Sequence, residues 1–239
     1  MSVRSSMNRV HRSVSLALSV VFIVMGIPLL SMSPIQGCRS QFAHSSSPQE
    51  QVSSVLPEIE ATEFDGIKLV PISGQGTNAI QGVRHIDINT YRLEVTGLVD
   101  HNLSLSYNDL LALPAVSEVV YMPCVEGWGY NAKWTGFKVK ALLDKAGVRP
   151  EGTYVMFYTD EGYASGHPLS FLQEPDVILA YGDNDMTLTE EHGYPLRLVA
   201  NNKYGYKWPK WIIKIVVMDH EEQGYWEQRG YSNAGDRTQ

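Results

Sequence analysis

Cysteine is scarce in this chain of 239 residues, which contains only Cys38 and Cys124. Two cysteines exclude a small scaffold held together by disulfides, and their wide separation excludes a zinc knuckle. Charged residues make up only 19% of the chain, whereas hydrophobic residues make up 44%. This composition is typical of a globular protein, and the length is enough for one sizeable domain or two small ones.

Acidic residues are absent from the first 49 positions, where the basic residues are Arg4, Arg9, Arg12 and Arg39. Residues 50–239 hold all 26 acidic side chains and 15 of the 19 basic ones, a net charge of −11. Because an acidic body repels a polyanion, the charge argues against general nucleic-acid binding. The first fifty residues thus differ in kind from the rest.

An apolar run extends from Val14 to Met32, directly after the basic start. This order predicts an export signal or an N-terminal membrane anchor. Gly26 and Pro28 interrupt the run, which disfavours a buried core helix. The residues Ile35-Gln-Gly-Cys38 resemble a lipobox, in which Cys38 would be the lipidated first residue of the mature chain.

Three segments are therefore predicted along the chain. Residues 1–38 form a signal, lipoprotein-type or anchor segment, and residues 39–60 form a polar linker rich in Ser, Gln and Pro. Residues 61–239 form the globular domain. We expect the N-terminus to associate this domain with a membrane, on the extracytoplasmic face.

Strands outnumber helices in the globular part, and the connections between them are short. A helix is predicted over Tyr107–Leu113 with Ser106 as its cap, and another where Val139 to Ala146 place their apolar residues on one face. The predicted strands are Tyr91–Gly97, Glu118–Met122, Tyr154–Thr159, Val177–Tyr181, Leu196–Ala200 and Trp211–Met218. The predicted class is α+β, with a dominant mixed sheet and short helices.

Cys124 lies between a predicted strand and a glycine-bearing loop, in Tyr121-Met-Pro-Cys-Val-Glu-Gly-Trp128. It could be a buried free thiol, a nucleophile paired with His167 or His192, or a soft thiolate ligand of a metal or metallo-cofactor. A disulfide with Cys38 is a fourth alternative. Spacing alone favours the buried thiol, because no nearby His or Cys completes a zinc site.

A second group of residues concentrates positive charge late in the acidic body. Its members are Arg197, Lys203, Lys207, Lys210 and Lys214, around the glycine turn Lys203-Tyr-Gly-Tyr-Lys207. Cations and free backbone N–H groups at such a turn suit a phosphate monoester. The interleaved tyrosines and tryptophans favour a flat ring system that carries the phosphate over a merely solvated basic loop.

Several motifs together resemble the oxidoreductase molybdopterin-binding domain of the sulfite oxidase superfamily, most of all its stand-alone prokaryotic members such as methionine-sulfoxide reductase catalytic subunits. The resemblance covers roughly Pro71 to Tyr231. The motifs are Cys124-Val-Glu-Gly-Trp128, Trp134-Thr-Gly-Phe137, His192-Gly-Tyr-Pro-Leu-Arg197-Leu, Lys203-Tyr-Gly-Tyr-Lys207-Trp-Pro-Lys210-Trp211 and Gly224-Tyr-Trp-Glu-Gln-Arg-Gly230-Tyr.

The resemblance implies a sulfite-oxidase-type fold and a molybdenum-molybdopterin cofactor, with one pterin for each molybdenum. Cys124 would be the molybdenum ligand and the indispensable catalytic residue. The implied cofactor-binding residues are Asn78, Thr159, His192, Arg197, Lys203, Lys207, Trp208, Pro209 and Lys210. His192 departs from the Asn of the reductases, although either side chain can donate a hydrogen bond.

The same resemblance implies an oxygen-atom-transferring oxidoreductase with a small oxide or oxyanion as its substrate. The loop after Cys124 carries Glu126 as its only charge, so we expect an S-oxide or N-oxide to be reduced more readily than sulfite is oxidised. A sulfite-oxidising enzyme, a non-catalytic binding domain and a cysteine hydrolase are the alternatives. No C-x-x-C-H haem motif is present, so a separate electron-transfer partner is expected, either a membrane haem protein or a quinone-linked protein. Arg9 and Arg12 are not adjacent, so they do not form the twin-arginine pair usual for exported molybdenum proteins, and either the anchor keeps the domain at the inner face of the membrane or export uses a different route.

Overall fold

The computed structural model describes residues 56–237. The predicted leader at 1–38 and all but the last residues of the linker at 39–60 lie outside this range, so those assignments stay predictions. Within residues 56–237 no helix has the length and apolar character needed to cross a membrane.

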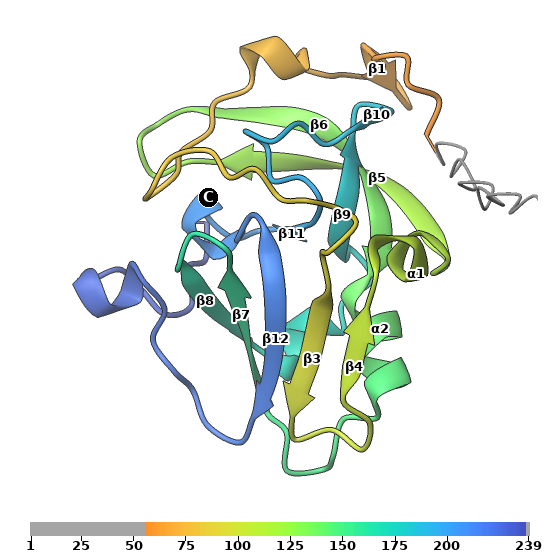
Figure 1. Ribbon diagram of the computed structural model, residues 1–239. Coiled ribbons are helices and arrows are strands. Elements are labelled where there is room, and N and C mark those ends of the chain that lie inside the picture. The colour runs from red at the N-terminus through yellow and green to blue at the C-terminus, as the bar shows by residue number, and fades with distance from the viewer. Residues whose placement is uncertain (1–55, 238–239) are drawn as a thin grey trace, which may run out of the picture. The chain divides into compact units, whose positions relative to one another are not determined.

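Two five-stranded sheets dominate the fold, together with a small hairpin, and Figure 1 shows them one above the other. The first sheet has the order β10-β9-β6-β5, with β11 also paired to β9, and all its pairs are antiparallel. Its strands are β5 (Ala115–Pro123), β6 (Gly129–Lys138), β9 (Val177–Asp183), β10 (Met186–Thr187) and β11 (Arg197–Ala200). The hairpin joins β1 (Glu63–Phe64) to β2 (Ile67–Lys68).

The second sheet has the order β4-β3-β12-β7-β8, in which β3 and β12 are parallel and the other pairs antiparallel. Its strands are β3 (Leu93–Gly97), β4 (Leu103–Leu105), β7 (Tyr154–Thr159), β8 (Ala164–Pro168) and β12 (Ile212–Met218). All six predicted strands are present. The short strands β1, β2, β4 and β10 and the longer β6 and β8 are absent from the prediction; β6 and β8 contain Lys, Asn, Gly and Pro at positions that weaken a simple strand pattern.

The helices are short, as predicted. Helix α1 (Tyr107–Leu111) begins with a capping box, because Ser106 accepts a bond from the Asp109 amide and Asp109 accepts one from the Ser106 amide. Helix α2 (Val139–Ala146) ends where Gly147 adopts φ 70°. The remaining pieces are α3 (Leu169–Leu172) and the 3₁₀ turns η1 (Ile72–Gly74), η2 (Gly205–Lys207) and η3 (Glu227–Arg229).

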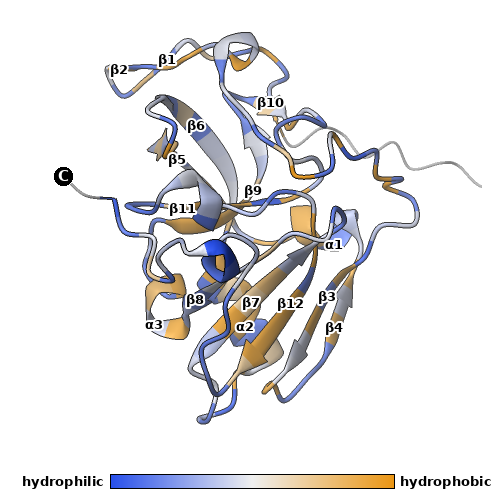
Figure 2. Cartoon of the chain, turned by 90° about the vertical axis from the view of Figure 1, so that its left-hand side faces the viewer, coloured by the Kyte–Doolittle hydropathy of each residue, from blue (hydrophilic) through white to orange (hydrophobic). Residues whose placement is uncertain are grey.

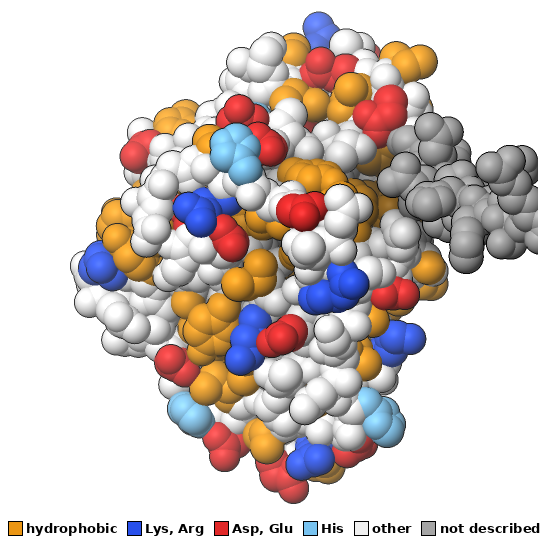
Figure 3. All heavy atoms as spheres, in the orientation of Figure 1, with side chains coloured by type: hydrophobic (Ala, Val, Ile, Leu, Met, Phe, Trp, Pro, Cys, Tyr) orange, Lys and Arg blue, Asp and Glu red, His pale blue; other side chains and the backbone are white. Residues whose placement is uncertain are grey.

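The core fills the space around the sheets and helix α2. Leu142 and Leu143 of that helix are buried with Phe137 of β6 and Phe157 of β7 in one apolar cluster. The colouring of Figure 2 shows the hydrophobic stretches along β7 and β12. On the face drawn in Figure 3, acidic and basic side chains of the described residues are interspersed, without a broad basic area.

Candidate functional site

A cavity of about 320 Å³ lies where five segments of the chain meet. Its walls come from residues 76–80, the tip of the β5–β6 hairpin, the β7–β8 turn, the loop from β11 to β12, and the C-terminal segment. The lining residues include six of the predicted site residues, which are Asn78, Cys124, Arg197, Trp208, Pro209 and Lys210. The fold therefore brings the predicted metal ligand and part of the predicted phosphate clamp into one space.

Cys124 is at the tip of the β5–β6 hairpin. Its amide donates to the carbonyl of Trp128 at 2.7 Å, and Gly127 follows with φ 90°, a conformation that favours glycine. The thiol is partly exposed and lies 3.9 Å from Oε2 of Glu126. Burial raises the pKa of this thiol, and the Glu126 carboxylate adds to the rise. Cys124 thus offers one soft sulfur donor, which its hairpin holds in the cavity lining.

Arg197 and Lys210 supply the positive charge of the cavity. Arg197 begins β11, is 3% exposed, and places its guanidinium 4.7 Å from the ring centre of Trp134. Lys210 is also buried, and its Nζ donates to Oγ1 of Thr77 at 2.6 Å and to the Glu191 carbonyl at 2.7 Å. Burial, together with the nearby Arg197, lowers the pKa of Lys210 to about 7. A bound anion would offset the cost of keeping these two buried side chains charged, so the pair suits a phosphate.

His192 does not line the cavity, but it contacts Arg197, which does. Its carbonyl accepts a hydrogen bond of 2.9 Å from Arg197, and its Nδ1 is 2.8 Å from Oγ1 of Thr189. Burial lowers its pKa to about 4, with Arg197 and Lys210 adding to the shift. His192 is therefore neutral near pH 7, and its Nε2 is buried without a partner. It can offer a hydrogen bond to a ligand, but it carries no charge there.

Residues 76–80 cross the cavity next to Cys124. Asn78 donates to Oε2 of Glu126 at 3.2 Å, and the indole of Trp128 donates to the same atom at 2.9 Å. A side chain at Gly76 would lie 2.7 Å from the Trp128 ring, so only glycine fits this approach. At the end of the crossing, Glu161 accepts from the Ile80 amide at 3.0 Å.

Four predicted cofactor-binding residues do not line the cavity: His192, described above, and Thr159, Lys203 and Lys207. The hydroxyl of Thr159 donates to the Tyr163 carbonyl at 3.1 Å, inside the β7–β8 turn. Lys203 forms an ion pair with Asp236 at 2.5 Å, and Lys207 forms one with Glu227 at 2.6 Å. Carboxylates already engage both lysines, so Arg197 and Lys210 are the members of the basic cluster that line the cavity.

The histidine alternatives for Cys124 find no support in the geometry. His167 is fully buried, stacks on Phe171, and has Nε2 at 2.9 Å from the Lys207 carbonyl. Within the described residues the hydrogen bond of the Cys124 thiol is to Glu126, not to a histidine. Cys38, the disulfide alternative, lies outside the described residues.

The sequence prediction used Tyr206 as one of the aromatic residues beside the basic cluster, but it did not assign Tyr163, Trp226 or Tyr231 to the site. The cavity lining contains Tyr163, Tyr206, Trp226 and Tyr231 in addition to the tryptophans near Cys124. The closing Gly224–Tyr231 motif was the available signal, since it contains two of these four side chains. The sequence did not indicate that the C-terminal segment folds back onto the loop that contains η2.

The unpartnered polar atoms around the cavity fit the cofactor that the resemblance implies. The buried atoms without partners include Nε of Arg197, Nε2 of His192 and the hydroxyl of Tyr130. Buried polar atoms without partners are rare unless a ligand satisfies them. Within the described residues no group of three or more His, Cys, Asp or Glu side chains could hold a metal. One thiolate beside orphaned donors and two cations suits a metal that arrives with a phosphorylated, polar-ringed cofactor.

Comparison with known proteins identifies relatives over most of the chain. The uncharacterized oxidoreductase YuiH of Bacillus subtilis is 36% identical over 154 residues, which are 64% of this chain and 78% of that protein. A putative protein-methionine-sulfoxide reductase subunit, YedZ1 of Azospira oryzae, is 33% identical over 179 residues, 71% of this chain and 68% of that protein. The mitochondrial sulfite oxidase of Drosophila melanogaster is 35% identical over 137 residues, but these are only 24% of that protein.

A solved structure confirms the predicted fold. The sulfane dehydrogenase SoxCD from Paracoccus pantotrophus superposes with a TM-score of 0.56 and 24% identity, over 78% of this chain and 58% of that one. The model of the oxidoreductase molybdopterin binding domain matches residues 80–226. The chain therefore belongs to the oxidoreductase molybdopterin-binding domain family, and it is an enzyme whose cofactor is molybdenum-molybdopterin.

Proposed function

We propose that this enzyme reduces a neutral S-oxide or N-oxide in preference to oxidising sulfite. The observation that carries the proposal is the placement of charge in the cavity. Of the lining residues within the described chain, only Arg197 and Lys210 are cations, and both are buried. The cofactor phosphate would engage them, which leaves no lining cation for a dianionic substrate.

The charge nearest the metal ligand is negative. Hydrogen bonds from Trp128 and Asn78 lower the pKa of Glu126, so this carboxylate is ionised at neutral pH. It lies beside the Cys124 thiol and lines the same cavity. A sulfite dianion would be repelled there, whereas a neutral oxide would not.

Three arginines outside the cavity, Arg84, Arg92 and Arg229, do not supply a cation for a dianionic substrate. Arg84 pairs with Asp160 at 2.7 Å, and Arg92 donates to the Tyr91 carbonyl at 2.6 Å. Arg229 stacks on the Tyr225 ring at 3.6 Å and donates to that residue's carbonyl. None of the three lines the cavity.

A neutral oxide needs a hydrogen-bond donor and an apolar wall. Tyr130 lines the cavity, and its buried hydroxyl has no acceptor for its proton. Burial raises the pKa of Tyr130 to about 12, so the hydroxyl keeps that proton at neutral pH. Trp128 lies parallel to Tyr130 at 6.3 Å and extends the apolar surface. Tyr130 can therefore donate to the oxide oxygen.

The residues that would hold the cofactor are Cys124 as the molybdenum ligand, Arg197 and Lys210 for the phosphate, and Asn78, His192, Trp208 and Pro209 around the pterin; Thr159 stays a prediction. When bound, this cofactor supplies two-electron oxygen-atom transfer. In the overall reaction the S–O bond breaks, sulfur gains two electrons, and the oxygen leaves as water with two protons. A reduced one-electron carrier, such as a haem protein or a viologen dye, provides the electrons.

The location and the physiological partner belong to the same proposal. The basic and apolar N-terminal sequence supports a membrane tether, with the domain on the extracytoplasmic face. A membrane haem protein or quinone-linked protein would then deliver electrons. The relative from Azospira oryzae, named as a methionine-sulfoxide reductase subunit, supports reduction of an S-oxide.

The test compares kcat/KM for sulfite with kcat/KM for dimethyl sulfoxide on one molybdenum-loaded preparation, with artificial dyes as electron acceptor and donor. We expect the sulfoxide to be the better substrate. A clear preference for sulfite would overturn the proposal in favour of a sulfite-oxidising enzyme, the alternative that the Drosophila relative supports.

A further inference from the structure

The C-terminal segment returns to the cavity after β12. The Tyr225 amide donates to the Ala164 carbonyl of β8 at 2.8 Å, and a side chain at Gly224 would collide with that same carbonyl. This close approach places Trp226 and Tyr231 in the cavity lining. Residues more than ninety positions after Cys124 thus form part of the wall around it.

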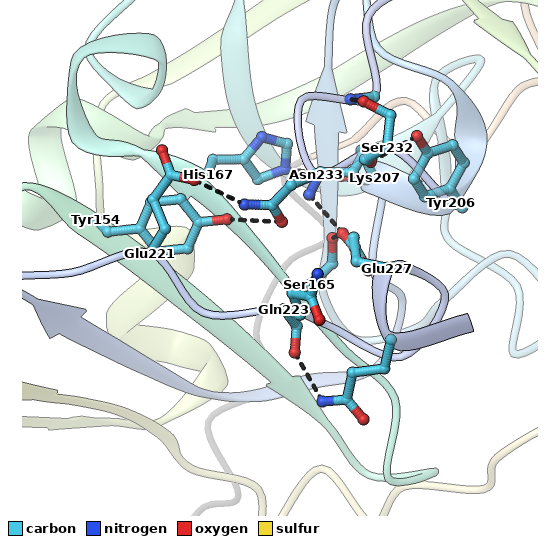
Figure 4. A network of polar contacts seen from close by, with 12 residues as sticks. Tyr154, Ser165, His167, Tyr206, Lys207, Glu221, Gln223, Glu227, Ser232 and Asn233 are labelled. Atoms are coloured by element: carbon cyan, nitrogen blue, oxygen red, sulfur yellow. Dashed lines mark hydrogen bonds and ion pairs between the residues drawn. The ribbon is translucent and has the colours of Figure 1, made fainter. Parts of the chain in front are cut away.

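An ion pair inside the protein fixes this segment in place. Nζ of Lys207 lies 2.6 Å from Oε1 of Glu227, and both side chains are 0% exposed. The hydroxyl of Ser165 donates to the same carboxylate oxygen at 3.3 Å, and Tyr206 donates to the Ser232 carbonyl at 2.9 Å. Figure 4 shows these contacts converging from β8, η2 and the C-terminal segment. The segment is therefore built into the fold rather than laid loosely over it.

Two rings of the C-terminal segment and one ring of η2 form one continuous surface, which we call the aromatic wall. Its residues are Trp226, Tyr231 and Tyr206. The ring centres of Tyr206 and Tyr231 are 5.1 Å apart, and those of Trp226 and Tyr231 are 5.2 Å apart. Tyr231 is 39% exposed, whereas the cations Arg197 and Lys210 in the same cavity are 3% and 8% exposed. The aromatic wall therefore lies toward the solvent side, and the charged floor lies deeper.

We propose that the aromatic wall determines substrate specificity by binding the apolar substituent of the oxide. This inference rests on the proposed function and names its substrate class, which is sulfoxides with an aryl or other bulky apolar group. Aromatic faces that are already partly exposed gain by covering such a group, and their orientation costs little because the ion pair holds it. A small oxide such as dimethyl sulfoxide is too short to use the wall.

The experiment measures kcat and KM of the molybdenum-loaded enzyme for methyl phenyl sulfoxide and dimethyl sulfoxide, with reduced viologen as the electron donor. In Trp226→Ala and Tyr231→Ala we expect kcat/KM for the phenyl substrate to fall about tenfold or more, mainly through KM. The value for dimethyl sulfoxide should stay within about twofold. Trp226→Phe, which keeps a ring, should recover most of the loss.

A matched control is Tyr121→Ala. Tyr121 is 37% exposed, close to the 39% of Tyr231, but it does not line the cavity. This variant should retain the wild-type preference. A second readout that does not depend on turnover is calorimetric binding of methyl phenyl sulfone, which carries the same ring, to the enzyme without an electron donor. Molybdenum content is measured for every variant.

The outcomes separate the two proposals. Equal losses for both sulfoxides, no loss for either, or the same selective loss in Tyr121→Ala would overturn the role of the aromatic wall while leaving sulfoxide reduction intact. If the wild-type enzyme reduces neither sulfoxide, the proposed function itself fails. Selective loss for the phenyl substrate, together with weaker sulfone binding at unchanged molybdenum content, supports the inference.

Discussion

The contribution of the buried Lys207–Glu227 ion pair to the free energy of unfolding can be measured directly by mutation. Both side chains are 0% exposed and their charged atoms are 2.6 Å apart. Glu227→Gln would leave the Lys207 ammonium buried without its counter-charge. Removal of one partner of a buried pair costs about 3–5 kcal/mol, a large part of the roughly 5–15 kcal/mol that stabilises a typical domain.

This free-energy cost can be compared with that of a surface ion pair that has the same distance between its charged atoms. Lys140 and Asp144 also approach to 2.6 Å, but their side chains are 50% and 61% exposed. Lys140→Met should therefore cost no more than about 0.5 kcal/mol, because exposed helical pairs contribute little. At roughly 2–4 °C per kcal/mol, Glu227→Gln should lower Tm by about 6–20 °C, while Lys140→Met shifts it by 2 °C or less.

The assay is urea unfolding of each variant, followed by circular dichroism, with the slope of the unfolding free energy checked for constancy. The double variant Lys207→Met/Glu227→Leu should recover much of the loss, because it leaves no buried charge unpaired. If Glu227→Gln differs from Lys140→Met by less than about 1 kcal/mol, the carboxylate is not the required partner of Lys207. The account of the C-terminal segment as a fixed wall would then be wrong.

Three further predictions concern the cofactor and pH. Cys124→Ser should leave a folded protein with negligible turnover and an altered molybdenum spectrum, because serine is a harder ligand than thiolate; wild-type turnover with an artificial donor would refute the ligand assignment. Arg197→Ala and Lys210→Ala should each lower molybdopterin content roughly ten- to a hundredfold at limiting cofactor, measured as the fluorescent oxidised pterin, and full content in the double variant would place the pterin elsewhere. Burial raises the pKa of Asp183 from 3.8 to about 7. At this carboxyl the folded state therefore binds more protons than the unfolded state between these values, so the contribution of Asp183 to the stability of the cofactor-free protein should fall as pH rises from 4 to 7, whereas the lowered pKa of His192 acts in the opposite direction. Asp183→Asn should flatten that dependence in urea unfolding, and an unchanged slope would contradict it.

Local sequence was enough to predict the elements that depend on local interactions. Ser106 caps the helix that follows it, together with Asp109 three residues on, and the helix from Val139 ends at Gly147 because that residue can adopt a positive φ. Strand β7 has the predicted bounds, Tyr154–Thr159, since it is a continuous run of apolar and β-favouring residues. Such signals lie within one element, so no distant residue is needed to recognise them.

The basic cluster shows what the sequence could not decide. Five cations stand close together in the chain, but Asp236 binds Lys203 and Glu227 binds Lys207, whereas Arg197 and Lys210 face the cavity. Which cations remain available to a phosphate depends on carboxylates that return only when the C-terminal segment folds back.

Cys124 and the aromatic side chains likewise separate what the sequence determined from what the tertiary structure decided. The sequence by itself determined that a thiol follows a strand and enters a glycine turn, and with the family motifs it determined the cofactor. The tertiary structure alone decided that Tyr206, Trp226 and Tyr231 share a cavity with that thiol. The physical reason is that a cavity is formed by side chains from several elements, whose approach is set by long-range packing and buried ion pairs rather than by spacing along the chain.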